Sequence, residues 1–150
     1  MNQKQQYGRF AVMIGISFVL MYAFMYAMVN VFANVYPSYN QFYMAGLMTA
    51  PMIVLEIGLM NMMYPNKKAN IAIMVGGVIF LVLCWVGIRQ QVGIGDEQFL
   101  KSMIPHHAGA ILMCEKAKLT DPEIKALCDG IVSGQQKEID QMKAILNRMK

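Results

Sequence analysis

Long stretches without charge fill most of the chain up to Ile88 and constrain the fold more than any other feature of the sequence. Only three charged residues lie between Phe10 and Ile88: Glu56, Lys67 and Lys68. Over the 150 residues, 57% are hydrophobic and 15% are charged, against about 25% charged residues in an average soluble domain. Nucleic-acid binding is not expected despite the net charge of +4, because the bases are few and lie beside apolar runs, where membrane topology explains them.

Three apolar runs in this half predict membrane-spanning helices: residues 10–33, 42–63 and 71–88. As helices rising about 1.5 Å per residue, they reach or approach the thickness of about 30 Å of a hydrocarbon core. A cleaved signal peptide is not favoured for the first run, because its apolar region would have only about 7–15 residues. Residues 1–89 are therefore predicted to form a membrane domain embedded in the lipid bilayer.

The distribution of basic residues predicts the orientation of this domain. Lys4 and Arg9 precede the first span, the connection 34–41 has no Lys or Arg, and the connection 64–70 has two lysines. By the positive-inside rule we expect the N-terminus to be cytoplasmic and the chain after Arg89 to be extracytoplasmic. Arg89 itself is an exception, because it is a basic residue at the outer end of the third span. We therefore expect a multi-pass protein of the inner (cytoplasmic) membrane whose C-terminal domain lies outside, in the oxidising periplasm of a Gram-negative cell.

Two kinds of residue inside the spans invite a functional interpretation. A carboxylate in lipid is costly, so Glu56 is expected to be neutral, near an interface or turned into the bundle, with Asn30 and Asn61 as candidate partners. The eleven methionines from Met13 to Met74 form stripes at helical spacing. We interpret these stripes as adaptable packing between helices rather than as a path for Cu(I).

The last third of the chain predicts two antiparallel helices. After a linker at residues 90–95, Asp96 is a plausible cap for a first helix, and Pro105 is expected to kink or restart it, because proline has no N–H to donate. Asp121, followed by Pro122 and Glu123, is a strong start signal for the second helix. No segment has a strand pattern, so the predicted fold is all-α, with three transmembrane helices followed by an antiparallel helical hairpin over residues 96–150.

The first helix of this hairpin carries both histidines of the chain and several soft donor atoms. Met103 and His107 are one turn apart and can converge on one ion, which Met142 can reach from the partner helix. Cys114 lies on the same side of the helix. Two further candidates lie on its flank: His106 and Met113. Imidazole and thioether ligands favour Cu(I) or Ag(I) over Mg²⁺ or Ca²⁺.

Other interpretations of the same residues stay open. Methionines at helical spacing are more often core residues than metal ligands, and of two adjacent histidines only one is expected to face the partner helix. Cys114 comes level with Cys128 in the hairpin, so in an oxidising compartment the two cysteines can form a disulfide. Cys84, inside an apolar run, is expected to be a small buried hydrophobic residue.

A family resemblance bears on these candidates. The segment from Met103 through His106-His107 to Met113, followed by Asp121-Pro122-Glu123 and the stretch from Gln135 to Met142, resembles the domain of unknown function 305 family. The resemblance covers about Asp96 to Lys150. It implies a ferritin-like helical bundle, of which the hairpin would be half, and a link to copper or silver binding and copper tolerance. On matching positions it implies five candidate ligands: Met103, His106, His107, Met113 and Met142.

No pattern in the sequence predicts an enzyme. A ferritin-type di-iron centre needs Glu three residues before His, which this chain lacks, and no GxSxG or phosphate-binding loop is present. The hairpin has too little core to stand alone, so we expect it to form a homo-oligomer or to dock on a partner such as a metal-donor or metal-acceptor protein. Two functions remain: binding of a soft metal ion, and a metal-free structural or interaction module.

Overall fold

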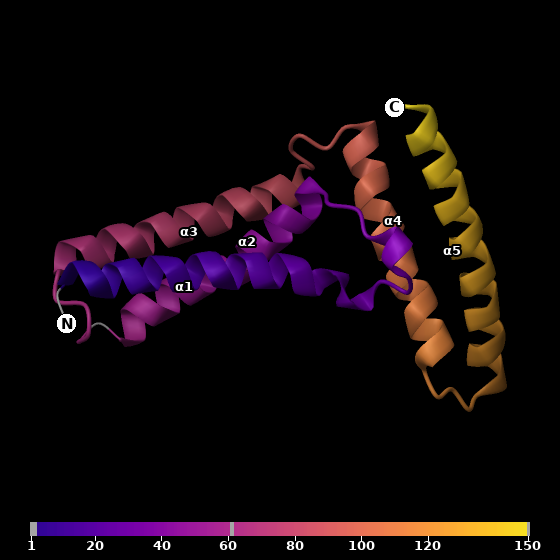
Figure 1. Ribbon diagram of the computed structural model, residues 1–150. Helices are drawn as coiled ribbons and strands as arrows, with labels where there is room; N and C mark the ends of the chain where they lie inside the picture. The colour runs from indigo at the N-terminus through magenta and orange to yellow at the C-terminus, as the bar shows by residue number, and fades with distance from the viewer. Residues whose placement is uncertain (1–2, 61, 150) are drawn as a thin grey trace. The chain divides into compact units, whose positions relative to one another are not determined.

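Helices are the only regular elements in the part of the chain that the computed structural model describes, residues 3–60 and 62–149 (Figure 1). The prediction of an all-α fold is confirmed. Two groups named in the sequence predictions lie outside the described part of the structure: Asn61 and the side chain of Lys4. The helices are, in chain order, α1 Gln3–Phe24, η1 Met25–Met28, η2 Phe32–Asn34, α2 Tyr39–Leu59, α3 Lys67–Arg89, α4 Asp96–Lys116 and α5 Pro122–Arg148.

The chain divides into two compact units, and each is described by itself. The first, called the apolar unit, consists of residues 3–24 and Asn40–Gly93, with helices α1, α2 and α3. The second, called the hairpin unit, consists of Met25–Tyr39 and residues 94–149, with η1, η2, α4 and α5.

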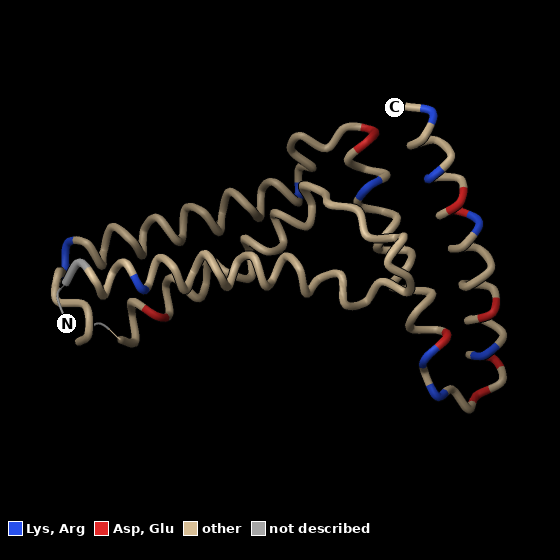
Figure 2. Tube along the Cα trace, viewed as in Figure 1, with Lys and Arg blue, Asp and Glu red and all other residues tan. Residues whose placement is uncertain are grey.

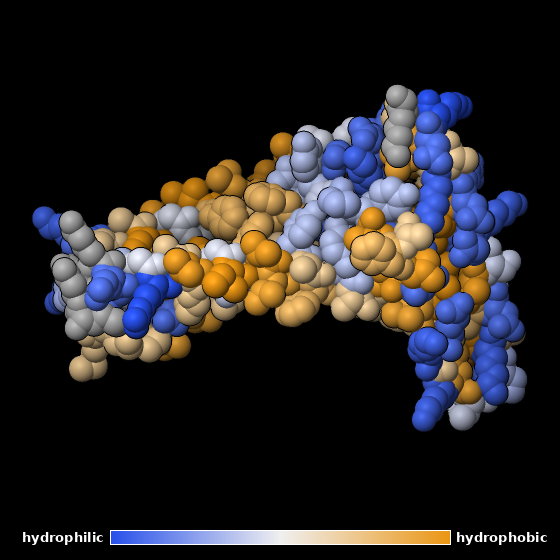
Figure 3. All heavy atoms as spheres, in the orientation of Figure 1, coloured by the Kyte–Doolittle hydropathy of each residue, from blue (hydrophilic) through white to orange (hydrophobic). Residues whose placement is uncertain are grey.

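Three helical stretches are long and apolar enough to cross a membrane: Gln5–Met28, Tyr39–Leu59 and Lys67–Arg89. Each of the three α-helices in them, with 22, 21 and 23 residues, is about 31–35 Å long, which suffices for a hydrocarbon core of about 30 Å. Their surfaces are apolar and carry few charges (Figures 2 and 3). The predicted spans and the helices differ most at the first span, because α1 ends at Phe24 and the chain does not continue as a helix to Ala33.

Small residues allow α2 and α3 to pack closely. A Cβ atom added at Gly46 of α2 would collide with the sulfur of Cys84 on α3, which is buried. A Cβ at Gly77 of α3 would meet Ile53 at 3.1 Å, and one at Gly87 would meet the ring of Tyr43 at 2.9 Å. This is the close helix approach that glycine permits, because it places no side chain between the two helices.

A cluster around Tyr64, in the connection between α2 and α3, closes one end of the apolar unit. Phe10, Ile57 and Tyr64 form its buried core. Asn70 donates to the carbonyl of Tyr64 at 2.8 Å and accepts from the hydroxyl of Tyr7 at 2.6 Å. Burial, followed by the charge of Glu56, raises the pKa of the Tyr64 hydroxyl, so the folded chain holds this group in its neutral, donating form.

In the hairpin unit, α4 and α5 pack along one apolar seam. Its core consists of Leu100, Ile104, Ala108, Ile111, Ile139, Met142 and Leu146. α5 begins as predicted, with the Asp121 carboxylate accepting from the backbone N–H groups of Glu123 and Ile124 at 2.8 and 3.2 Å. α4 differs from the prediction at its start, where the cap is Gly95 rather than Asp96. Of the two alternatives predicted at Pro105, a kink or a restart, the helix does not restart.

The segment between α1 and α2 completes this core. Val29 and Tyr36 pack against the seam of α4 and α5. The Tyr26 hydroxyl donates to the carbonyl of Tyr36 at 2.9 Å, and the backbone N–H of Tyr39 donates to the side chain of Gln98 on α4 at 3.0 Å. Part of the predicted first span and first connection therefore belongs to the hairpin unit, which is more than two helices.

Candidate metal centre

His107 is the polar residue at the centre of the α4–α5 seam. It is 8% exposed, and both of its ring nitrogens have partners. Nδ1 lies 2.9 Å from the carbonyl oxygen of Met103, one turn earlier on α4, and Nε2 lies 2.6 Å from a carboxylate oxygen of Glu138 on α5. The imidazole is thus held by its own helix on one side and by the partner helix on the other.

The partners of His107 distinguish its two ring nitrogens. A carbonyl oxygen can only accept, so Nδ1 donates to the carbonyl of Met103. Nε2 lies against the carboxylate of Glu138 on the partner helix. With Nδ1 occupied by a backbone carbonyl, Nε2 is the nitrogen that can bind a metal, in the arrangement by which such bonds orient metal-binding histidines.

Both methionines predicted to accompany His107 lie along the same seam. Met142 is part of its buried core with 9% exposure, and Met103 packs against that core while remaining partly exposed. On α4, Met103 lies one turn before His107, and on α5, Met142 lies one turn after Glu138. Residues one turn apart share a helix face, so each pair lies on the side of its helix that faces the other. The same burial also fits an ordinary role of these methionines as core residues.

The remaining candidate ligands do not join this group. His106 is exposed, with its ring centroid 6.2 Å from that of His107. Met113 is 53% exposed. Cys114 forms a disulfide with Cys128 across the hairpin, with a Cα–Cα distance of 5.3 Å, and so has no free thiolate to offer. Among residues 3–60 and 62–149, no group of three or more His, Cys, Asp or Glu side chains is arranged to hold a metal ion.

Glu138 is the member of the centre that the sequence did not number among the candidate ligands, although it lies on the facing wall of the hairpin. In an antiparallel hairpin with its turn centred near Thr120 and Asp121, residues equally far from the turn would place Gln135 opposite His107. The structure places Glu138 there instead. Helix side chains lean toward the N-terminus of their own helix, so that of His107 points away from the turn and that of Glu138 points back toward it. Allowing for this lean would have brought Glu138 to His107 from sequence alone.

Glu56 lies in the last turns of α2, in the apolar unit. It is half-buried, and the hydroxyl of Tyr64 lies 3.5 Å from its carboxylate. Asn30, one of its predicted partners, instead accepts from the side chain of Asn34 at 2.8 Å, within the hairpin unit. The carboxylate is therefore near the end of a helix beside a phenol, which does not make a binding site.

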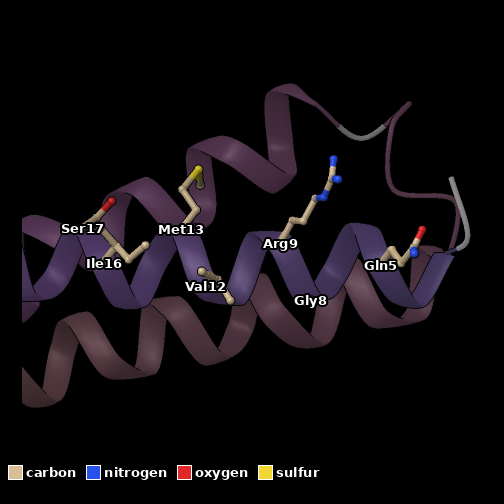
Figure 4. A pocket seen from close by; sticks show the side chains of 7 residues that line it. All are labelled: Gln5, Gly8, Arg9, Val12, Met13, Ile16 and Ser17. Atoms are coloured by element: carbon tan, nitrogen blue, oxygen red, sulfur yellow. The ribbon is translucent and has the colours of Figure 1, made fainter.

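A shallow hollow runs along α1 and does not make a site either (Figure 4). Its lining comes from α1 alone: Gln5, Gly8, Arg9, Val12, Met13, Ile16 and Ser17. Val12 and Ile16 are 61% and 55% exposed, and a Cβ at Gly8 would meet nothing within 4 Å. This face of α1 has no second wall, so it cannot enclose a ligand.

Comparison with known proteins gives two matches. The family described as Domain of unknown function (DUF305) matches residues 88–146, which include α4 and most of α5. An uncharacterized protein of Acanthamoeba polyphaga mimivirus is 39% identical over 113 residues, which are 74% of this chain and 72% of that protein. The aligned 113 residues are more than the chain contains from residue 88 to residue 150, so the alignment also includes residues before 88. No solved structure matches the chain.

Proposed function

We propose that this chain, whose residues 88–146 match the DUF305 family, binds a soft metal ion, Cu(I) or Ag(I), in its hairpin unit. The observation that carries the proposal is the position of His107. Its Nδ1 is tied to the Met103 carbonyl, and its Nε2 points across the seam to Glu138.

In this proposal His107 supplies the nitrogen ligand through Nε2, and the metal binds on the side of the ring that faces Glu138. The Glu138 side chain is 55% exposed, so it can rotate away or remain beside the ion. The thioethers of Met103 and Met142 supply the soft ligands that favour Cu(I) and Ag(I) over hard cations. The backbone bond to Nδ1 keeps the ring oriented when the metal binds.

The membrane topology in this proposal follows from charge. Arg9 lies near the start of α1, and Lys67 and Lys68 begin α3. The positive-inside rule therefore assigns these helix ends to the cytoplasm, so the chain after α3 would be extracytoplasmic. The disulfide between Cys114 and Cys128 supports the same assignment, because disulfides persist in oxidising compartments. The role would be copper handling or tolerance outside the cytoplasm, with the metal passed to or from another protein.

Anaerobic titration of the full chain in detergent micelles tests the metal site. Wild type and a His107→Gln variant would be titrated with Cu(I) in competition with a chromophoric chelator, under conditions that keep the disulfide oxidised. We expect His107→Gln to weaken binding at least tenfold. The matched control is His106→Gln, which changes the exposed neighbour and should bind within twofold of wild type. Equal affinity of wild type and His107→Gln would reject the site.

The alternative is a module that binds no metal and associates through its surface. It is favoured by two exposed apolar side chains on α5, Ile124 at 47% and Leu127 at 62%. In this case the pair of His107 and Glu138 serves only to join α4 to α5. Sedimentation of the metal-free chain in detergent, wild type against Leu127→Glu, distinguishes the two: a loss of self-association in the variant, together with no metal binding in wild type, selects the alternative.

A further inference from the structure

The tip of the hairpin is held together differently from the rest of it. From Leu112 to Glu138, through the turn between α4 and α5, no side chain is fully buried. The buried residues of the core lie beyond this stretch, from Leu100 to Ile111 on α4 and from Ile139 to Leu146 on α5, and Val132 packs against them while remaining partly exposed. Closest to the turn, the disulfide between Cys114 and Cys128 joins the two helices covalently.

Because the core is separate from the disulfide, reduction of the disulfide should leave the packing of α4 on α5 intact. The core of α4 and α5, with Val29 and Tyr36 packed on it, does not include Cys114 or Cys128. After reduction the two thiols would remain on neighbouring helices whose Cα atoms are 5.3 Å apart. Both side chains are partly exposed, so reductants and ions can reach them. Reduction would thus produce two thiols that are already positioned next to each other.

The surroundings of the pair decide which ion it suits. Thiolates are soft ligands that select Cu(I), Zn²⁺ or iron–sulfur clusters. Structural zinc needs four ligands, usually Cys and His, and no third His, Cys, Asp or Glu joins the pair in the described part of the chain. Two thiolates without further ligands suit monovalent Cu(I) or Ag(I), which accept two sulfur ligands.

We propose that Cys114 and Cys128 form a second soft-metal site that is closed by the disulfide and opened by reduction, and that it binds one Cu(I) or Ag(I) ion. The reductant is an external dithiol. One of its thiolates attacks a sulfur of the disulfide, forming a mixed disulfide and releasing the other cysteine; its second thiol then resolves the mixed bond. The reductant leaves as a disulfide, two electrons and two protons reach the cysteines, and the incoming ion displaces those protons.

The site goes beyond the centre at His107 and does not depend on it. Cys114 is two turns further along α4, and its sulfur is bonded to Cys128, whereas Nε2 of His107 faces Glu138. Cys84, the remaining cysteine, is a free and buried thiol of the apolar unit. A dithiol does not change its redox state, so it should not contribute to a difference between the oxidised and reduced chain.

The test compares the oxidised and reduced full chain in detergent micelles. Reduction uses dithiothreitol, which is removed anaerobically before titration with Ag(I) and, separately, with Cu(I) against a chromophoric chelator. We expect the reduced chain to bind one more ion than the oxidised chain, with a thiolate-to-metal charge-transfer band in the ultraviolet. A Cys114→Ser/Cys128→Ser variant should lack this increment, and its circular dichroism should show the helix content of wild type.

Each outcome bears on one site alone. An increment that persists in His107→Gln supports the cysteine site even if the centre at His107 binds nothing in the oxidised chain. Equal stoichiometry in the oxidised and reduced wild type overturns the cysteine site. An increment that survives in the double serine variant also overturns it, because another group then binds the ion.

Discussion

The two units use opposite solutions to the same problem of packing helix against helix. In the apolar unit, α2 and α3 approach through glycines, and the large apolar side chains point outward: Leu55 is 58% exposed and Leu83 63%. In the hairpin unit, the facing sides of α4 and α5 bury large apolar side chains, with Ile104 and Ile139 fully buried, and most charged residues lie on the outer sides (Figures 2 and 3). The difference shows that close approach of backbones organises one unit and burial of side chains organises the other.

The largest expected effect is in the core of the hairpin unit. Ile139→Ala removes a fully buried side chain and should lower the free energy of unfolding of this unit by about 2–5 kcal/mol. Hydrogen exchange measured by mass spectrometry on the full chain in micelles would show faster exchange in peptides of α4 and α5. Leu127→Ala, at a position 62% exposed on the same helix, is the control and should change stability by less than about 0.5 kcal/mol. Similar effects of the two substitutions would show that the seam is not the core.

Removing the disulfide should have the next largest effect. For a separation of 14 residues, the Cys114→Ser/Cys128→Ser variant should lose about 3 kcal/mol of hairpin stability, chiefly through the entropy of the unfolded chain. Exchange should accelerate most at the tip, around the turn between α4 and α5. If peptides around Ile104 lose protection to the same extent, the core and the tip are not separate.

The close packing of α2 on α3 can be tested by adding a single methyl group. Gly46→Ala places a Cβ against Cys84 and should destabilise the apolar unit by about 1–3 kcal/mol through overpacking. Gly15→Ala, where a Cβ meets nothing within 4 Å, is the matched control and should stabilise α1 slightly, since alanine is the better helix former. Thermal loss of helix in micelles measures both variants. Equal melting temperatures would contradict a glycine-dependent contact.

The smallest expected effect concerns the start of α5. Asp121→Ala removes the acceptor of two backbone N–H groups and should cost about 1 kcal/mol. Hydrogen exchange should accelerate in the first turn of α5, at Glu123 and Ile124, and not in α2 or α3. Asp129→Ala, an exposed position in the middle of the same helix, should leave that turn unchanged; an equal effect would argue against the cap.

Local signals predicted those parts of the fold that depend on local chemistry. Charge-free runs located α2 and α3, and the Asp121-Pro122 pair located the start of α5. Cys114 and Cys128 are equally far from the turn of an antiparallel hairpin, which predicted that they could form the disulfide that the structure contains. Each of these follows from spacing along one helix or across one short turn.

The parts that the sequence did not predict depend on tertiary contacts. Residues after Phe24 are as apolar as a span, yet they leave α1 and place Val29 and Tyr36 on the hairpin core, which no periodicity indicates. At Pro105 the sequence left a kink and a restart open, and α4 continues through it despite the hydrogen bond that proline cannot donate. Of the adjacent histidines, only His107 is buried, and its partner Glu138 depends on how side chains lean between helices.

X-ray absorption at the copper edge of the oxidised full chain, loaded anaerobically with one equivalent of Cu(I), tests the proposed centre most directly. The disulfide removes Cys114 and Cys128 from the set of ligands, so the account predicts a shell of one imidazole nitrogen with thioether sulfur. Multiple scattering from the imidazole ring should disappear in His107→Gln and persist in His106→Gln. A copper shell without imidazole scattering in the wild-type chain would contradict the assignment of His107 as the ligand on which the site is built.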